Sequence, residues 1–104
     1  MKIFLAGHKG LVGSAILRKL KKKNYKNIIT ADRKKLDLLN QKSVYKFLKK
    51  KKPDIVIIAA AKVGGVLNNS KHGADFIYEN LQIQNNLIHG SYVNKIKKLI
   101  FLGS

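Results

Sequence analysis

The sequence lacks cysteine and any long apolar run, and both absences restrict what the protein can be. Without cysteine there is neither a disulfide framework nor a thiolate metal site. No apolar stretch approaches the ~20 residues that a membrane-spanning helix requires, and MKIFLAG is too short in apolar residues for a signal peptide. We therefore expect a cytoplasmic protein with no membrane partner. Its 104 residues, 45% of them hydrophobic, predict one small globular domain over 1–104.

Acidic residues are also scarce, because five Asp and Glu oppose 22 Lys and Arg and leave a net charge of +17. Such an excess can indicate a nucleic acid or an anionic membrane as partner. The lysines crowd into RKLKKKNYK and KFLKKKKPD, which we interpret as helix ends, and aromatic residues are not interleaved with them in the way that a platform for stacking bases would require. Nearly all are Lys rather than Arg, the better residue for bidentate phosphate recognition. The pattern favours a solvated basic surface over a nucleic-acid site.

Strand-like and helix-like segments alternate along the chain. The apolar runs KIFLA, NIITA, DIVIIAAA and KLIFL predict strands, and the third is continuous, as in a strand covered on both faces. Helices are predicted over 12–23, 43–52 and 74–89, the second ending before Pro53. This alternation predicts an α/β fold, a Rossmann-like doubly wound parallel sheet truncated to about four strands in the order 3-2-1-4. The apolar side of the third helix is assigned to Phe76, Ile77, Leu81, Leu87 and Ile88.

A glycine-rich stretch, GHKGLVG, connects the first predicted strand to the first helix. Gly7 permits a tight turn, Gly10 lets the backbone approach a pyrophosphate, and Gly13 lets the helix pack against the strand. The free amides and the positive end of the helix would then face the phosphates. The alternative is a βα turn that binds nothing, but the position between strand and helix favours a dinucleotide site.

The residues after the second predicted strand give conflicting indications about the cofactor. Asp32 stands where an acid would bind the ribose hydroxyls of NAD, whereas Arg33 and Lys9 would hold the 2′-phosphate of NADP. Asp37 and Leu38 lie where the adenine edge is covered. After the third run, the small residues of AAAKVGG, including Ala60, leave room for cofactor and substrate at the carboxyl edge of the sheet.

Six stretches of the sequence occur together in one order and at one spacing: AGHKGLVGSAI, LDLLNQ, AAAKVGGVLNNS, ADFIYENL, NNLIHG and KKLIFLGS. In these stretches, their order and their spacing, the chain resembles the GDP-L-fucose synthases, which belong to the extended branch of the short-chain dehydrogenase/reductase superfamily. The six stretches extend over almost the whole chain but match only the family's N-terminal part. The resemblance therefore implies that residues 1–104 are the N-terminal part of an NAD(P)-binding Rossmann domain, without the rest of that domain and without the substrate domain. The resemblance implies an NADP-dependent epimerase/reductase that converts GDP-4-keto-6-deoxymannose, a nucleotide-linked 4-keto sugar, to GDP-L-fucose.

The same resemblance assigns roles to individual residues. His8 to Val12 would line the phosphate loop, Arg33 would approach the 2′-phosphate, and residues 102–104 would flank the nicotinamide. Ser104 matches the serine that hydrogen-bonds the substrate carbonyl. The family often has Arg in place of Ala31, so NAD is not excluded. The implied cofactor-binding residues are Gly7, His8, Lys9, Gly10, Leu11, Val12, Gly13, Arg33, Asp37, Leu38, Ala60, Leu102 and Gly103; the catalytic residue is Ser104; no metal ligands are predicted.

The family's remaining catalytic residues have no counterpart in this sequence. Its Tyr-x-x-x-Lys pair and the Cys and His of the epimerisation lie further along the chain, so we expect these 104 residues alone to be inactive. Tyr45 and Lys49 match Tyr-x-x-x-Lys only formally, since they precede the third strand. A full-length form is expected to be a homodimer. The alternative function is a half-Rossmann module that binds a nucleotide or a polyanion without chemistry.

Overall fold

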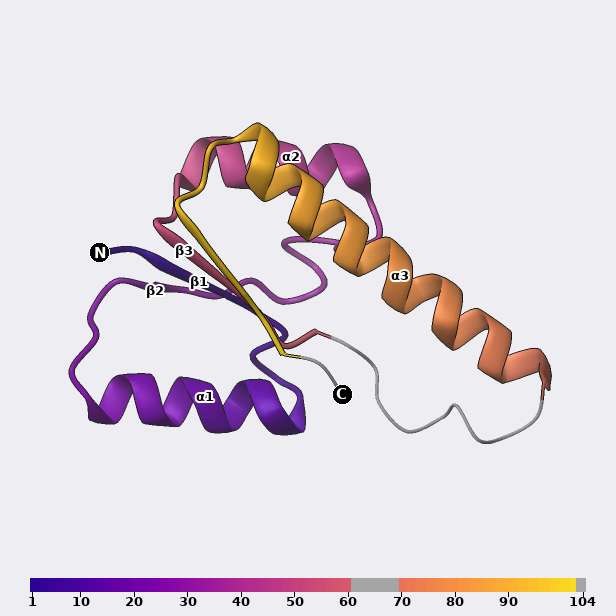
Figure 1. Ribbon diagram of the computed structural model, residues 1–104. Helices are drawn as coiled ribbons and strands as arrows, with labels where there is room; N and C mark the ends of the chain where they lie inside the picture. The colour runs from indigo at the N-terminus through magenta and orange to yellow at the C-terminus, as the bar shows by residue number, and fades with distance from the viewer. Residues whose placement is uncertain (61–69, 103–104) are drawn as a thin grey trace.

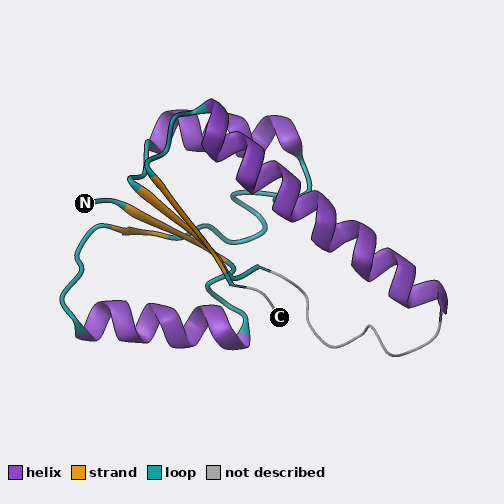
Figure 2. Cartoon of the chain, in the orientation of Figure 1, coloured by secondary structure: helices purple, strands orange, loops and turns teal. Residues whose placement is uncertain are grey.

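A parallel sheet of four strands lies between two layers of helices in the computed structural model, which describes residues 1–60 and 70–102 (Figures 1 and 2). Helix α1 covers one face of the sheet, and α2 and α3 cover the other. The predicted doubly wound, Rossmann-like fold is therefore confirmed. The elements are β1 (Ile3–Ala6), α1 (Leu11–Lys22), β2 (Ile28–Ile29), α2 (Gln41–Lys51), β3 (Ile55–Ile58), α3 (Ser70–Val93) and β4 (Lys98–Phe101).

The strand order is β2-β1-β3-β4, and the predicted order 3-2-1-4 is wrong. That prediction put the third strand at an edge, but β1 and β3 are the buried centre of the sheet and pair in parallel from Ile3–Ile55 to Ala6–Ile58. The continuous apolar run of β3 requires cover on both faces, which only a central strand receives. The chain moves in one direction along the sheet from β1 to β2, and in the other direction from β2 past β1 to β3. Because crossovers between parallel strands are right-handed, these two connections place α1 and α2 on opposite faces of the sheet.

Alternate residues of the central strands separate the core into two halves. On the α1 side, Ile3, Leu5 and Ile57 are buried against apolar residues of that helix. On the other side, Phe4 and Val56 pack with buried residues of α2 and α3. This period of two is what a sheet covered on both faces requires.

Helix α2 begins two residues earlier than its predicted start at Ser43. Asn40 precedes the helix in extended conformation, and its side-chain oxygen accepts a hydrogen bond of 3.0 Å from the backbone amide of Ser43. Asn40 is therefore the N-cap, a position that Asn and Ser both favour. The last turn carries Lys49, Lys50 and Lys51, whose charges suit the negative end of the helix dipole.

Helix α3 is longer than predicted and is apolar on two sides rather than one. Its buried side holds Ile83 and Leu87, whereas Ile77, Leu81 and Ile88 are about half exposed. The prediction that these three share a side with Leu87 is wrong, because helical spacing puts them on the opposite side. Phe76, the fifth residue of that prediction, lies outside the described side chains. Within the described residues, no helix is long and apolar enough to cross a membrane.

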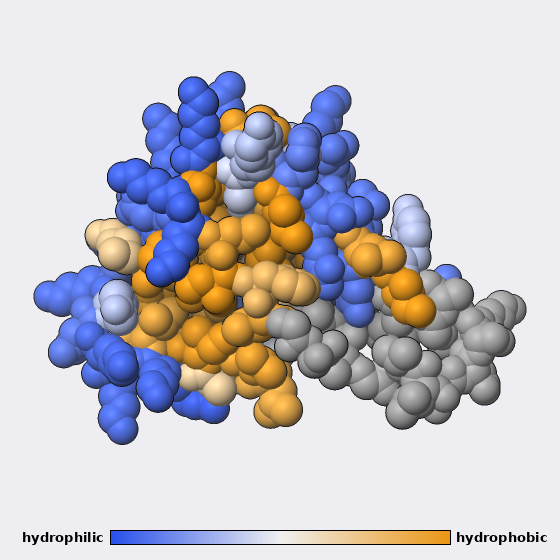
Figure 3. Space-filling view, in the orientation of Figure 1, coloured by the Kyte–Doolittle hydropathy of each residue, from blue (hydrophilic) through white to orange (hydrophobic). Residues whose placement is uncertain are grey.

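Strand β4 forms one edge of the sheet. Ile100 and Leu102 pack on the α1 side, whereas Leu99 and Phe101, which alternate with them along the strand, are exposed. Figure 3 shows apolar surface across the middle of this view of the molecule. The sheet therefore has an apolar, unpaired edge at β4, among the residues described.

Candidate functional site

The loops that leave the four strands meet at one edge of the sheet. Because the strands are parallel, their carboxyl ends lie together. The glycine loop follows β1, Arg33 follows β2, Ala60 follows β3 and Leu102 follows β4. The fold thus gathers residues that the sequence analysis named from separate stretches; Gly103 and Ser104 lie outside the described residues.

Gly7 turns the chain at the end of β1 and packs it against the end of β3. Its φ of +91° lies in the left-handed region that favours glycine. A Cβ at Gly7 would lie 2.6 Å from the Cα of Ala60 and 2.7 Å from the carbonyl oxygen of Ala59. The glycine loop therefore packs directly against the backbone of Ala59 and Ala60, and this close contact requires glycine at position 7.

Gly13 brings α1 directly under the same loop. A Cβ at Gly13 would lie 1.7 Å from the carbonyl oxygen of Gly7, so no other residue fits without displacing the backbone. At Gly10 a Cβ would meet only the Gly7 oxygen, at 3.7 Å, which is an ordinary contact. Gly13 is thus needed for packing, whereas the space beside Gly10 is open and a ligand can approach the backbone there.

The first turn of α1 carries no feature that would neutralise its positive end. Gly10 caps the helix without a side-chain hydrogen bond, and no acidic residue lies in the first turn. Leu11 is 89% exposed and Val12 51% exposed, so apolar side chains flank the helix start. Backbone amides at a helix start, together with an open glycine loop, suit a phosphate group.

Asp32 is held by its own turn rather than presented to a ligand. Its Oδ1 accepts a hydrogen bond of 3.0 Å from the backbone amide of Lys35, and this bond is the main reason why the pKa of Asp32 is lowered. The positive charge of Lys9 lowers the same pKa further. Lys9 of the glycine loop and Asp32 after β2 are therefore near enough for their charges to interact. Arg33 beside it is exposed. The carboxylate is therefore ionised at neutral pH, and the positive charges that act on it are those of Lys9 and Lys35.

The segment containing Asp37 and Leu38 is fixed by a residue that the sequence analysis missed. The amide of Leu39 donates to Asp37 Oδ1 at 3.0 Å, which closes a local turn. Asn86 of α3 is 2% exposed and donates from Nδ2 to the carbonyl oxygen of Leu38 at 2.8 Å. The sequence signal that could have indicated this role is the polar Asn86 beside Leu87, on the side of α3 that also carries Ile83.

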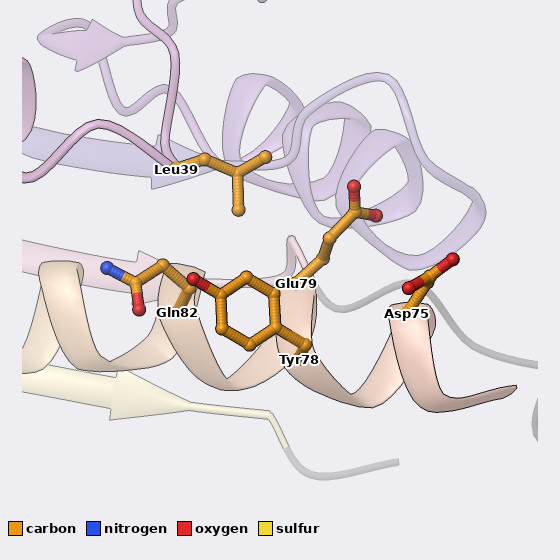
Figure 4. Close-up of a pocket in the computed structure, with 5 residues that line it drawn as sticks. All are labelled: Leu39, Asp75, Tyr78, Glu79 and Gln82. Atoms are coloured by element: carbon orange, nitrogen blue, oxygen red, sulfur yellow. The ribbon is translucent and has the colours of Figure 1, made fainter. Parts of the chain in front are cut away.

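A separate shallow pocket of about 300 Å³ lies between this segment and α3. Figure 4 shows Leu39 facing side chains of α3 across it. The lining residues are Leu39, Asp75, Tyr78, Glu79 and Gln82. Its two acidic side chains make it a poor place for a phosphate, so the glycine loop remains the candidate phosphate site.

Tyr45, the first residue of the formal Tyr-x-x-x-Lys match, lies between α2 and α3. Its hydroxyl is hydrogen-bonded to Nδ1 of His89 and accepts from Nε2 of Gln41 at 3.2 Å. Its ring lies where a Cβ on Gly90 would contact it. Tyr45 is thus engaged in helix packing. Among the described residues, no group of three His, Cys, Asp or Glu side chains could hold a metal ion.

Comparison with known proteins shows similarity over the whole chain. It is 53% identical to GDP-L-fucose synthase 1 of Arabidopsis thaliana and 55% identical to GDP-L-fucose synthase of Sinorhizobium fredii, over 99% of this chain and 32% of each relative. The predicted resemblance to GDP-L-fucose synthases is therefore confirmed. Among solved structures, the GDP-mannoheptose C4 reductase MlghC from Campylobacter jejuni, with NADP bound, is 48% identical and superimposes with a TM-score of 0.90 over 98% of this chain and 30% of its own.

This chain thus spans about a third of the length of the curated relatives it matches. The model of the NAD dependent epimerase/dehydratase family matches residues 3–104, which include the glycine loop and all four strands. The chain belongs to the NAD dependent epimerase/dehydratase family.

Proposed function

We propose that this chain is the N-terminal part of the cofactor-binding domain of a GDP-L-fucose synthase-like enzyme. That enzyme would be an NADP-dependent epimerase/reductase that converts GDP-4-keto-6-deoxymannose to GDP-L-fucose. The observation that carries the proposal is the glycine loop: it is packed on β3 through Gly7 and on α1 through Gly13, in a chain more than half identical to GDP-L-fucose synthases.

Each part of the carboxyl edge has a role in this proposal. The amides of the glycine loop and of the start of α1 bind the pyrophosphate, and Lys9 and Arg33 hold the 2′-phosphate. The small side chain of Ala60 would leave room for the cofactor and the substrate, and the chain from Leu102 onward would flank the nicotinamide. NADPH supplies a hydride when it is bound. Ser104 donates a hydrogen bond to the carbonyl oxygen of the substrate, where negative charge develops during reduction.

The 104 residues alone should bind the cofactor without turning over the sugar. The chain has no cysteine, and its Tyr-x-x-x-Lys match is engaged between α2 and α3. Isothermal titration calorimetry of the chain with NADPH tests the binding. Incubation with NADPH and the 4-keto sugar tests whether the sugar is turned over. A chain that binds no NADPH would overturn the assignment. We place the protein in the cytoplasm, where the nucleotide sugar and NADPH would be available.

Replacing Arg33 with alanine should change the choice between cofactors. Loss of a charge-assisted hydrogen bond to the 2′-phosphate should weaken NADP binding about tenfold or more, while NAD binding should change little. Arg18→Ala is the matched control, because Arg18 is an exposed arginine on α1 away from the loops. Equal weakening of NADP and NAD by Arg33→Ala would show that Arg33 does not read the 2′-phosphate.

A full-length form that continues beyond Ser104 should be a homodimer through α3. The support is the half-exposed apolar line of Ile77, Leu81 and Ile88, which the core formed by residues 1–60 and 70–102 leaves uncovered. Leu81→Lys in that form should shift the mass measured by light scattering from dimer to monomer. Tyr25→Lys, at an exposed position outside α3, should leave the dimer intact. A Leu81→Lys protein that stays dimeric would rule out this surface.

A further inference from the structure

Most of the lysines of the chain lie along one edge of the sheet, the amino edge. In a parallel sheet, the last turns of the helices and the starts of the strands share this edge, opposite to the glycine loop. Figure 3 shows hydrophilic side chains crowding this side of the molecule, at the left. The exposed lysines of this edge are Lys2, Lys19, Lys21, Lys22, Lys23, Lys26, Lys49, Lys50, Lys51, Lys52, Lys95, Lys97 and Lys98.

Little on the amino edge offsets this charge. Asp54, at the start of β3, is the acidic residue found there, and its carboxylate accepts a hydrogen bond of 2.8 Å from the backbone amide of Lys2. The other described acidic residues, Asp32, Asp37, Asp75 and Glu79, lie in the loops after β2 and in the first half of α3. The C-terminal ends of α1, α2 and α3 carry partial negative charge and favour lysines at this edge. The number of lysines there is larger than this effect requires.

Exposed apolar and aromatic side chains accompany the lysines on the same edge. Met1 precedes β1 and is 69% exposed, Tyr25 lies between α1 and β2 and is 44% exposed, and Tyr92 ends α3 and is 79% exposed. Surfaces that rest on a bilayer combine lysines, which contact anionic headgroups, with side chains that enter the headgroup boundary. Tyrosine suits that boundary because one end of its ring is apolar and the other polar.

We propose that the amino edge is a docking surface for an anionic phospholipid bilayer. The sequence analysis predicted no membrane partner, because the chain lacks a spanning segment and its lysines were interpreted as a solvated surface. A peripheral contact needs no spanning segment, and the fold collects these lysines at one edge. Lysine is a compact point charge that attracts phosphate headgroups without the bidentate geometry with which arginine reads nucleic acids. The edge also lies opposite the cofactor loops, so a protein resting on it keeps the candidate site facing the solution.

Two charge-matched variants of the 104-residue chain test this proposal. The edge variant carries Lys21→Gln, Lys22→Gln, Lys50→Gln and Lys51→Gln; the control variant carries Lys34→Gln, Lys35→Gln, Lys42→Gln and Lys46→Gln, exposed positions away from the amino edge. Flotation with vesicles of phosphatidylglycerol and phosphatidylcholine measures binding. Vesicles of phosphatidylcholine alone report apolar adsorption, and a single-stranded oligonucleotide reports general affinity for polyanions.

The unchanged chain should float with the anionic vesicles, lose that binding as salt is raised, and ignore the neutral ones. The edge variant should bind about 100-fold more weakly, whereas the control variant should lose less than about tenfold. Equal loss in both variants would overturn the proposal, because net charge alone would then explain binding. Absence of anionic vesicle binding, or tighter binding to the oligonucleotide than to the vesicles, would also overturn it.

Discussion

Gly13→Ala should sharply lower the melting temperature of the chain. The new methyl group would lie 1.7 Å from the carbonyl oxygen of Gly7 and 2.7 Å from its carbonyl carbon, which are backbone atoms that cannot rotate away as a flexible side chain can. Forcing extra volume into packed structure costs about 1–3 kcal/mol or more, and a domain of this size loses about 4–8 °C per kcal/mol. We therefore expect thermal melting, followed by circular dichroism, to fall by more than about 10 °C.

Gly10→Ala is the matched control for this prediction, since it adds the same methyl group three residues earlier, at the N-cap of α1. That methyl would meet the Gly7 oxygen at 3.7 Å, so the melting temperature should stay close to that of the unchanged chain. NADPH binding should nevertheless weaken, because the methyl occupies space through which the pyrophosphate approaches the backbone. If Gly13→Ala melts like Gly10→Ala, α1 does not pack on the loop as the structure has it.

The packing of the glycine loop could be predicted from sequence because it depends on local spacing. Gly7 and Gly10 lie between β1 and α1, and Gly13 lies in the first turn of α1, so the tight turn and the close packing follow from neighbouring residues. The order of the strands does not follow in this way. The continuous apolar run of β3 indicates burial on both faces, which is typical of a central strand. The predicted order nevertheless followed the usual Rossmann order and put this strand at an edge.

Contacts between distant segments were beyond the reach of sequence patterns. Asn86 could be noticed as a polar residue among the apolar ones of α3, but no period in either segment says that it binds the carbonyl oxygen of Leu38, 48 residues earlier. The sequence analysis also assigned the apolar residues of α3 to a single side. Apolar spacing alone does not say which of two apolar lines on a helix packs against the sheet. Likewise, the lysines before β2, β3 and β4 form separate runs in the sequence, and only the parallel topology brings them to one edge.

Ser104→Ala in a full-length form should reduce kcat by about 100- to 1,000-fold, which is the usual effect of removing one donor to a developing oxyanion. The affinity for NADPH should remain nearly unchanged, because the hydroxyl is assigned to the substrate carbonyl rather than to the cofactor. Steady-state kinetics with the 4-keto sugar, combined with NADPH titration, separate these two quantities. The prediction rests on the resemblance of KKLIFLGS, since Ser104 lies outside the described residues.

Ser43→Ala provides the matched control for Ser104→Ala. Ser43 lies in the first turn of α2, and the bond that it makes to the Asn40 cap uses its backbone amide, which alanine retains. Turnover should therefore be unaffected. Unchanged kcat in Ser104→Ala would remove Ser104 from the catalytic set, whereas a parallel loss of NADPH affinity would mean that it shapes the cofactor site instead. Only a fall in kcat at constant cofactor affinity supports a hydroxyl that acts on the substrate carbonyl during hydride transfer.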